Sequence, residues 1–453
     1  MVIVVIGTGY VCLVSGACLA DLGHEVICVD NSTEKIKALV DGKMPIHEPG
    51  LAALVEKQAG KRLHFSCEAA AHMGRADIVM LAVGTPPSPD GQADLSFLFK
   101  AAEDIALHLR PQATIVVKST VPVGTARRLR QRISVLRPIA KGALISNPEF
   151  LREGCAIKDF MEPDRIVIGH GRGETATAMS ELYAPLLAKG VPLVAMSNEA
   201  AELCKYAANT YLAMRVAYVN ELADLCEAVG ADIESVTLGM GLDRRIGQHY
   251  LHPGPGFGGS CFPKDTSALL ASAEAAGVDF RLGKTIVESN ERRKHSLVSR
   301  VARAVGGVLT GKTIAVLGLA FKANTDDTRD SAALRLVADL QARGAKVRAY
   351  DPVANKAERS DSLSPCTSAQ DAVRGADAAV IMTEWQEFRA LDLHMLARLL
   401  RQPVLVDFRN LFGLAKARAA GLSYHSLGRA TVRKRAPRQR GLRPSRSRLS
   451  VTA

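Results

Sequence analysis

The chain has 453 residues, 47% of them hydrophobic, 5% aromatic and 23% charged, which excludes a disordered protein and favours a globular α/β protein of two or three domains. Its nine cysteines form no CxxC pair and no zinc-type Cys/His spacing, so we expect neither a disulfide scaffold nor a metal site, but a reducing, cytoplasmic setting. The formal charge of +12 includes eight Arg and one Lys after Gly428, and the remaining charge of about +3 gives no indication of a nucleic-acid partner for the body of the chain.

The first twenty residues are apolar enough to be mistaken for a signal peptide or a membrane span, but they contain no basic leader. Glycine, threonine and tyrosine interrupt the run, and no later stretch reaches the roughly 18 unbroken apolar residues of a span. The pattern predicts a buried strand over residues 2–6, a helix over Val11–Leu22 that ends at Gly23, and a second strand over His24–Val29. These elements form one βαβ unit.

The turn of this unit carries a dinucleotide-binding pattern. Gly7 and Gly9 let backbone N–H groups come close to a pyrophosphate at the helix N-terminus. Asp30 ends the second strand, where a carboxylate can accept hydrogen bonds from ribose hydroxyls and repel the extra phosphate of NADP. Cys12 stands where the third glycine is expected, and we expect it to weaken cofactor binding modestly. The unit therefore predicts an NAD site.

Apolar runs that end in polar loops continue at Ala76–Pro86, Thr114–Thr125 and Ala143–Phe150. Strands separated by helix-length segments predict a parallel sheet with helices on both faces and ligands at the carboxyl ends of its strands. A helical period without Gly or Pro follows over Asn198–Val229 and ends at Gly230, which predicts a long connecting helix.

A Gly/Pro-rich segment, His252–Asp265, and further helices to about Val305 lead into a second α/β domain. Its strands are predicted within Lys312–Lys322, Ala345–Pro352, Asp377–Trp385 and Pro403–Asn410. The predicted fold is α/β, with two Rossmann-like, doubly wound parallel-sheet domains (residues 1–197 and 306–428) joined by a central helical domain (residues 198–305). Residues 429–453 are predicted to be a disordered basic tail, either simply solvated or in contact with an anionic surface.

The Gly/Pro-rich segment and the residues just before it, from Tyr250 to Cys261, are called the glycine-rich loop below. One cysteine, Cys261, ends the sequence GGSC of this loop and precedes FPKD. Most single cysteines are buried and inert, but these glycines permit close backbone approach, Lys264 could favour the thiolate, and Asp265 could orient a neighbouring group. Cys261 is therefore a candidate nucleophile.

Six segments of the chain together form a highly specific set of motifs. They are VGTP from Val83, KSTVPVGT from Lys118, NPEFLREG from Asn147, the helix with Lys205 and Asn209, RIGQHYLHPGPGFGGSCFPKD from Arg245, and FKANTDDTRDS from Phe321. Through them the chain resembles the UDP-glucose 6-dehydrogenases, members of the UDP-glucose/GDP-mannose dehydrogenase family, over about positions 1 to 425. The resemblance implies a two-step, four-electron oxidation of UDP-glucose at C6 to UDP-glucuronate, which consumes two NAD and one water without releasing the aldehyde.

The residue types suit this chemistry. Oxidising an alcohol needs a proton acceptor, and oxidising the aldehyde further needs a nucleophile, which a thiol supplies through a thiohemiacetal and a thioester. Lys205 and Asn209 are one helical turn apart, so both can stabilise an oxyanion in one site. The resemblance makes Cys261 the nucleophile and Asp265 its catalytic partner. It also implies that Glu149 works through water in thioester hydrolysis and that Thr120 helps to hold this water.

The resemblance implies two sets of binding residues. Those for the sugar nucleotide are Glu149, Phe150, Leu151, Arg152, Lys205, Asn209, Tyr250, Leu251, His252, Pro253, Gly254, Gly258 and Lys322, with Arg245 supplied by a neighbouring subunit. Those for NAD are Gly7, Gly9, Tyr10, Val11, Asp30, Lys35, Thr85, Thr120, Glu153, Lys264 and Arg329. A dimer or a higher assembly built on the Asn198–Val229 helix would follow.

Two alternatives stay open. The first is a sister enzyme with the same chemistry on GDP-mannose or UDP-N-acetylmannosamine, although the segment YLHPGPGF from Tyr250 resembles the glucose enzymes more. The second is a catalytically impaired regulatory homologue, which Cys12 and the basic tail suggest and the intact set Cys261, Lys205, Asn209, Asp265 and Glu149 opposes.

Overall fold

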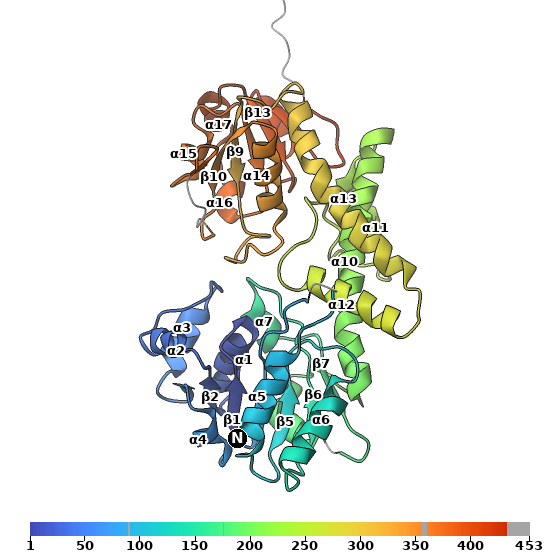
Figure 1. Ribbon diagram of the computed structural model, residues 1–453. Helices are drawn as coiled ribbons and strands as arrows, with labels where there is room; N and C mark the ends of the chain where they lie inside the picture. The colour runs from blue at the N-terminus through green and yellow to red at the C-terminus, as the bar shows by residue number, and fades with distance from the viewer. Residues whose placement is uncertain (89–90, 175, 355–359, 433–453) are drawn as a thin grey trace, which may run out of the picture.

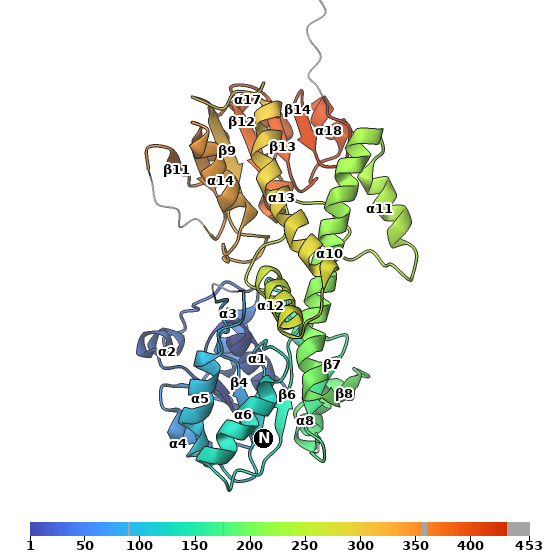
Figure 2. The ribbon, with the colours of Figure 1, turned by 45° about the vertical axis from the view of Figure 1, so that its right-hand side comes forward.

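The computed structural model of the chain describes residues 1–88, 91–174, 176–354 and 360–432. It contains two sheet domains, one at each end of the molecule, and a helical part along one side (Figure 1). Helix α10 (Asn198–Val229) runs beside both domains, and α12 (Phe262–Ala275) lies between them, as the turned view in Figure 2 also shows. No helix within these described ranges combines the length and hydrophobicity needed to cross a membrane.

The N-terminal domain is built on an eight-stranded sheet. In spatial order its strands are β3 (Leu63–Ser66), β2 (Glu25–Val29), β1 (Val2–Ile6), β4 (Ile78–Leu81), β5 (Thr114–Val117), β6 (Leu144–Ser146), β7 (Ile166–His170) and β8 (Leu193–Ser197). All neighbouring strands are parallel except β6 and β7, which meet in antiparallel fashion at Ser146 and Gly169. The expected parallel sheet is therefore confirmed, with one antiparallel contact that the sequence pattern does not reveal.

Helices cover both faces of this sheet because its strands are apolar on both sides. In β1, Ile3 and Val5 belong to one buried apolar cluster, and Val4 and Ile6 belong to another. The helices of this domain are α1 (Tyr10–Asp21), α2 (Thr33–Val40), α3 (Leu51–Gln58), α4 (Ala69–Met73), α5 (Ser96–Ala106), α6 (Thr125–Leu136), α7 (Ala156–Met161), α8 (Thr177–Leu182) and α9 (Ala184–Leu187).

The C-terminal domain repeats this plan on a smaller scale with a six-stranded parallel sheet. In spatial order its strands are β11 (Leu363–Pro365), β10 (Lys346–Tyr350), β9 (Thr313–Leu317), β12 (Ala378–Ile381), β13 (Val404–Asp407) and β14 (Ser423–Ser426). Its helices are α14 (Ala332–Ala342), α15 (Ala369–Val373), α16 (Gln386–Arg389), α17 (Leu393–Leu399) and α18 (Leu414–Ala419). The two sheets confirm the predicted fold class.

The central part consists of α10, α11 (Ile233–Gly241), α12 and α13 (Arg281–Ala304). At the start of α10 the hydroxyl of Ser197 accepts a hydrogen bond from the N–H of Ala200, and at its end Gly230 takes the left-handed conformation with φ of 77°. These two caps explain why the helix has the bounds predicted from the sequence.

The prediction of a tail that begins at Arg429 is wrong at its first residues. The guanidinium of Arg429 is buried and donates to Glu234 of α11, to the Tyr424 hydroxyl and to the carbonyl of Phe412. Val432 pairs with Tyr424 through backbone hydrogen bonds. Composition alone groups Arg429 with the basic residues after it, whereas the carboxylate of Glu234 and two buried acceptors hold it in the fold. The rest of the predicted tail, residues 433–453, lies outside the described residues.

Candidate active site

A cavity of about 690 Å³ lies where the three parts of the chain meet. Its walls come from the ends of β5 and β6, from α10, from the glycine-rich loop before α12 and from the segment after β9. The predicted site residues that line it are Glu149, Phe150, Leu151, Arg152, Glu153, Lys205, Asn209, Tyr250, Gly258, Cys261 and Lys322. The cavity thus lies at the carboxyl ends of the N-terminal strands, where ligands bind in open α/β sheets.

The glycine-rich loop takes its shape from the C-terminal domain that packs on it. A Cβ atom at Gly258 would lie 2.4 Å from the carbonyl oxygen of Asp330. One at Gly259, where φ is +81°, would lie 2.7 Å from the ring of Phe321. Only glycine permits this approach, which brings Cys261 to the N-terminus of α12, at the wall of the cavity.

Lys205 and Glu149 form a buried ion pair on the cavity wall. Lys205 Nζ lies 3.0 Å from Glu149 Oε1, and the two side chains are 3% and 5% exposed. Burial alone would raise the pKa of Glu149, but Lys205 and the N–H of Leu151 outweigh it and hold this pKa below its ordinary value. Burial likewise opposes the charge of Lys205, yet Glu149, Asp265 and Cys261 together raise its pKa. Lys205 is therefore a fixed cation, suited to stabilise an oxyanion rather than to remove a proton.

The surroundings of the Cys261 thiol raise its pKa above the ordinary value. Burial is the largest cause of its raised pKa, and the carboxylates of Glu149 and Asp265 add to it, while Lys205 and a contact with the Ser260 hydroxyl at 3.7 Å act in the opposite direction. The expectation that Lys264 favours the thiolate is not met, because its ammonium group donates to Asp265. Lys205 of α10 is instead the cation that lowers the thiol pKa.

Asp265 is buried beside the thiol and held by two donors. Asn209 Nδ2 donates to Asp265 Oδ2 at 2.6 Å, and Lys264 Nζ donates to Oδ1. Asn209 and Lys205 both face the cavity from adjacent turns of α10, as the spacing predicts. Lys205, Asn209 and Cys261 therefore line one space, and Asp265, which is not part of the cavity wall, is bound to Asn209.

The dinucleotide turn lies between β1 and α1. Gly7 has φ of +107°, a Cβ atom at Gly9 would meet nothing within 4 Å, and no side chain caps the first N–H groups of α1. Asp30 follows β2 and accepts hydrogen bonds from the hydroxyl and N–H of Thr8 at 2.6 and 2.9 Å. Open N–H groups beside a fixed carboxylate fit the pyrophosphate and ribose of a dinucleotide.

Cys12 lies directly beneath this turn. Its thiol is fully buried and donates to the carbonyl of Ala82 at 2.7 Å. Burial raises the pKa of this thiol to about 12, so it stays protonated and can act as a donor. A Cβ atom at Gly7 would lie 3.0 Å from Cys12 Sγ, which shows how closely this side chain fills the space that a third glycine would leave empty.

Of the other predicted cofactor residues, Glu153 lines the cavity and the rest lie outside its wall. The Tyr10 hydroxyl contacts Glu48, Lys35 Nζ lies 3.9 Å from Asp30, the Thr85 hydroxyl donates to the carbonyl of Thr120, and Val11 is partly buried in α1. Glu153 accepts hydrogen bonds from Thr325 and Ser260, and Arg329 lies 3.9 Å from it. Burial and Asp327 raise the pKa of Glu153 to about 6. Glu153 thus joins the N-terminal domain, the glycine-rich loop and the C-terminal domain.

Several predicted substrate residues lie outside the cavity. Leu251, His252, Pro253 and Gly254 belong to the glycine-rich loop but do not form the cavity wall, nor does Thr120. Arg152 lines the cavity while its guanidinium is bound by Asp159. Arg245 pairs with Asp243 and its side chain is 89% exposed, so it contributes nothing to the cavity of its own chain.

Lys118 and Asn147 also line the cavity, although the sequence analysis gives them no role. Lys118 Nζ donates to Asn147 Oδ1 at 3.1 Å, and the Tyr183 hydroxyl donates to the same oxygen at 2.7 Å. Burial lowers the pKa of Lys118 to about 8. The sequence contains a signal that could have identified these two residues as part of the site. Both directly follow predicted strands, β5 and β6, and polar residues at such positions face the edge of the sheet where ligands bind.

A dinucleotide turn and a second nucleotide-binding-like sheet, with a cavity where their domains meet, are typical of a dinucleotide-dependent dehydrogenase. Comparison with known proteins gives the particular group: the chain belongs to the UDP-glucose/GDP-mannose dehydrogenase family. Residues 1–187 match the NAD binding domain of this family, 199–292 its central domain and 315–413 its UDP binding domain.

Individual relatives extend over nearly the whole chain. A UDP-glucose 6-dehydrogenase of Rhizobium meliloti (strain 1021) is 47% identical over 435 residues, which are 95% of this chain and 100% of that protein. The structure of a UDP-glucose dehydrogenase from Pyrobaculum islandicum is similar with a TM-score of 0.86 and 36% identity, and the match covers 95% of this chain and 98% of that one. A UDP-N-acetylmannosamine dehydrogenase from Pyrococcus horikoshii has a TM-score of 0.84 and 27% identity, with coverages of 95% and 99%.

Proposed function

We propose that this chain is an NAD-dependent dehydrogenase that oxidises C6 of UDP-glucose to a carboxylate, which gives UDP-glucuronate. One observation carries the proposal: the Cys261 thiol, the Lys205–Glu149 ion pair and the Asn209–Asp265 pair share one site between the dinucleotide turn and the UDP binding domain. The 47% identical relative, which is named a UDP-glucose 6-dehydrogenase, supports the choice of sugar.

The N-terminal domain fits NAD. Gly7, Gly9 and the first N–H groups of α1 would hold the pyrophosphate, and Asp30 would hold the ribose. Bound there, NAD supplies the two-electron acceptor for each oxidation. The carboxylate of Asp30, whose pKa Thr8, Ser32 and Lys35 keep low against the effect of burial, stays charged and repels the extra phosphate of NADP.

In the first oxidation the alcohol at C6 gives up a proton and a hydride and becomes an aldehyde. Asp265 is the proton acceptor in this proposal, since Asn209 and Lys264 fix its two oxygens beside the cavity. Lys205 and Asn209 stabilise the negative charge that develops on the sugar oxygen. Their fixed positions on α10 avoid reorganisation during the step.

The Cys261 thiol then adds to the aldehyde. A carbon–sulfur bond forms as the carbonyl double bond opens, and the thiol proton passes to the sugar oxygen. The resulting thiohemiacetal gives up a proton and a hydride and becomes a thioester. Water attacks the thioester, the carbon–sulfur bond breaks, and the carboxylate leaves with the thiol restored. Glu149 lies at the cavity wall, where it can orient this water, whereas Thr120 lies outside the wall and has no geometric support for the role predicted for it.

The test is the number of NADH molecules formed per UDP-glucose consumed by the purified full-length protein. Two NADH per sugar supports the four-electron reaction. Turnover with GDP-mannose or UDP-N-acetylmannosamine, but not with UDP-glucose, would move the chain to a sister activity. No turnover with any of the three would favour the impaired, regulatory alternative.

Replacing Cys12 with glycine tests the departure in the dinucleotide turn. The variant restores the third glycine but removes the hydrogen bond to the carbonyl of Ala82 and leaves a small void. These effects oppose one another, so we expect the dissociation constant of NAD to change by less than about tenfold, which corresponds to about one ordinary hydrogen bond. Calorimetric titration with NAD measures it, and a larger change in either direction would contradict this expectation.

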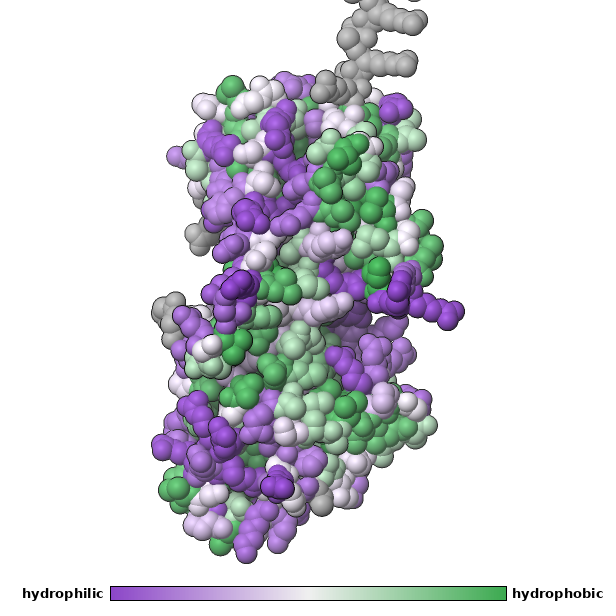
Figure 3. All heavy atoms as spheres, turned by 90° about the vertical axis from the view of Figure 1, so that its right-hand side faces the viewer, coloured by the Kyte–Doolittle hydropathy of each residue, from purple (hydrophilic) through white to green (hydrophobic). Residues whose placement is uncertain are grey.

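A dimer or a higher assembly on α10 is part of the proposal. Tyr211, Tyr218 and Leu225 recur at every seventh position of α10, and each is more than half exposed. Leu238 of α11 and Leu242, which directly follows this helix, extend this apolar face, and Figure 3 shows hydrophobic atoms gathered on this side of the molecule. An exposed apolar face of this kind is typical of a subunit interface. It would place Arg245 of one copy near the cleft of its partner.

We expect Tyr218→Glu to separate the copies, because it would bury an unpaired carboxylate in the interface. Sedimentation velocity of both proteins at equal concentration measures this. A wild-type chain that sediments as a monomer would contradict the proposed assembly.

The cytoplasmic setting, which rests on the scattered cysteines without CxxC pairs, is also a proposal.

A further inference from the structure

Two helices hold the glycine-rich loop from opposite sides, well before it reaches the thiol. The N–H of Gly254 donates to Asn220 Oδ1 of α10 at 2.8 Å, and the carbonyl of Gly254 accepts from Arg293 Nε of α13 at 3.0 Å. Further along, the amide of Asn290 both accepts from the N–H of Phe257 and donates to its carbonyl. The backbone of the loop is therefore fixed at two places by buried side chains of α10 and α13.

Arg293 is an unusual residue for a purely structural contact between helices. Its side chain is 3% exposed, and its Nη1 donates to Asp224 of α10 at 2.6 Å. Its buried Nη2 has no partner within the described part of the chain. Burying a cation with one donor unsatisfied is costly, and two uncharged residues could pack these helices together at lower cost. The burial of Arg293 is therefore explained better if its hydrogen bond to the carbonyl of Gly254 has a role beyond the packing of the two helices.

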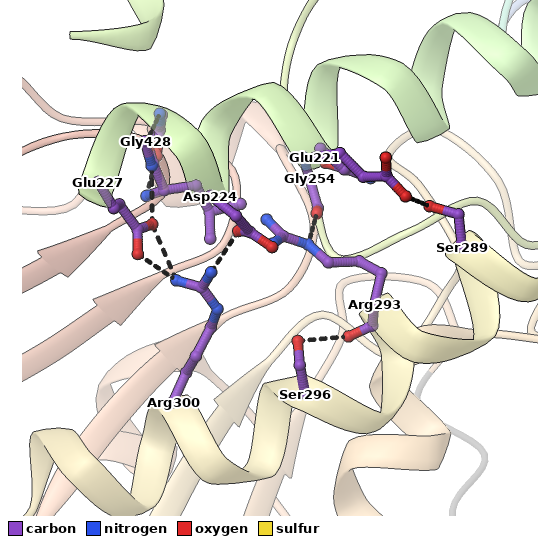
Figure 4. Close-up of polar contacts among 12 residues, drawn as sticks. Glu221, Asp224, Glu227, Gly254, Ser289, Arg293, Ser296, Arg300 and Gly428 are labelled. Carbon is purple, nitrogen blue, oxygen red and sulfur yellow. Dashed lines mark hydrogen bonds and ion pairs between the residues drawn. The ribbon is translucent and has the colours of Figure 1, made fainter. Parts of the chain in front are cut away.

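A neighbouring arginine provides a direct comparison. Arg300, two turns further along α13, pairs with Asp224 and with both oxygens of Glu227 on the same face of α10 (Figure 4). Figure 4 shows Arg293 reaching Gly254 as well, whereas Arg300 bridges only the helix carboxylates. The pair Ser289–Glu221 adds a third link between the helices. Helix packing therefore has other supports, and the contact with the loop distinguishes Arg293.

We propose that Arg293 is a positioning residue that acts through the carbonyl of Gly254 to set the loop from Tyr250 to Cys261. The loop supplies Tyr250, Gly258 and the thiol to the cavity, so its position governs both the sugar-nucleotide side of the site and the exposure of Cys261. The part of this inference that concerns the substrate rests on the proposed function. The part that concerns the thiol does not.

The test compares Arg293→Met with Arg300→Met in the full-length protein. Both changes remove a cation from the α10–α13 contact and leave Asp224 without one of its two partners, but only the first releases the loop. We measure the rate at which iodoacetamide labels Cys261, read at its own peptide by mass spectrometry, and the KM for UDP-glucose and for NAD. Thermal melting of both variants records the loss of helix packing.

We expect Arg293→Met to change the labelling rate of Cys261 and to raise the KM for UDP-glucose by about tenfold to a hundredfold, the effect of losing a hydrogen bond from a charged donor. The KM for NAD should change much less, and Arg300→Met should leave both constants near those of the wild type. Arg293→Lys, which keeps the charge but cannot serve Asp224 and Gly254 together, should lie between.

Equal labelling rates and equal KM values in the two methionine variants would overturn the inference and leave Arg293 as a structural contact. If Arg293→Met does not fold, Arg293→Lys and Asn220→Ala, which frees the other side of Gly254, provide the same comparison. A wild-type protein without activity on UDP-glucose would refute the proposed function alone, since the labelling experiment needs no substrate.

Discussion

Replacing Cys261 with serine is expected to lower the rate of complete UDP-glucose oxidation by at least about a thousandfold, the usual scale for loss of a covalent nucleophile. The serine hydroxyl keeps the shape of the site, but its oxygen ionises far less readily than sulfur at neutral pH. The second oxidation should therefore stall, and the yield should fall below two NADH per sugar. Stopped-flow and steady-state measurements of NADH with the purified variant provide both numbers.

Cys204→Ser is the matched control for this variant. Cys204 is also partly exposed and lies on α10, but it is absent from the cavity wall, so the same chemical change there should leave the NADH yield at two. A Cys261→Ser protein that still forms two NADH per sugar at a wild-type rate would remove the thioester from the mechanism. Equal losses in both variants would point to a general effect on folding.

The raised pKa of Cys261 adds a pH dependence that requires no substrate. Burial, with Glu149 and Asp265, keeps the thiol protonated at neutral pH, so the reactive thiolate is a minor form that grows as the pH rises. The labelling rate of Cys261 by iodoacetamide should rise about tenfold per pH unit below its pKa. A rate that is already at its plateau at neutral pH would show that Lys205 outweighs burial in this site.

The sequence predicts most of the fold because strong local patterns and the tertiary structure agree. The helix Asn198–Val229 lacks Gly and Pro and has a cap at each end, and the apolar strands of the N-terminal sheet form a buried cluster on each of its faces. The antiparallel contact between β6 and β7 was not predictable in this way. Strand direction depends on how the chain returns to the sheet, which a pattern of apolar residues does not encode.

Within the site, the sequence predicts which residues gather but not how they pair. Lys264 is close to Cys261 in sequence, yet its ammonium group turns to the adjacent carboxylate of Asp265, while Lys205, 56 positions away from Cys261, acts on the thiol. Lys118 was missed for a related reason, since an isolated lysine after a strand is ordinarily an exposed cation. Only the packing of Tyr183 and Asn147 around it makes it a buried one.

Lys205→Met should be nearly as damaging as the loss of the thiol, and it should act in three ways. The oxyanion loses its fixed cation, which we expect to lower kcat by about a hundredfold to a thousandfold, as for the loss of one preorganised electrostatic contact. The pKa of Cys261 should rise further, because Lys205 has the larger effect of the two side chains that lower it. Glu149 becomes an unpaired buried carboxylate, which should cost about 3–5 kcal/mol of stability.

Two further variants separate these effects. Glu149→Gln removes a carboxylate that raises the pKa of Cys261, so its thiol should label faster than that of the wild type at a given pH, whereas the thiol of Lys205→Met should label more slowly. In the double variant the unpaired charge is gone, and much of the thermal stability should return because neither partner of the ion pair remains buried alone. Activity should not return with it, since the cation is still missing. Recovery of both together would mean that Lys205 serves the fold and not the reaction.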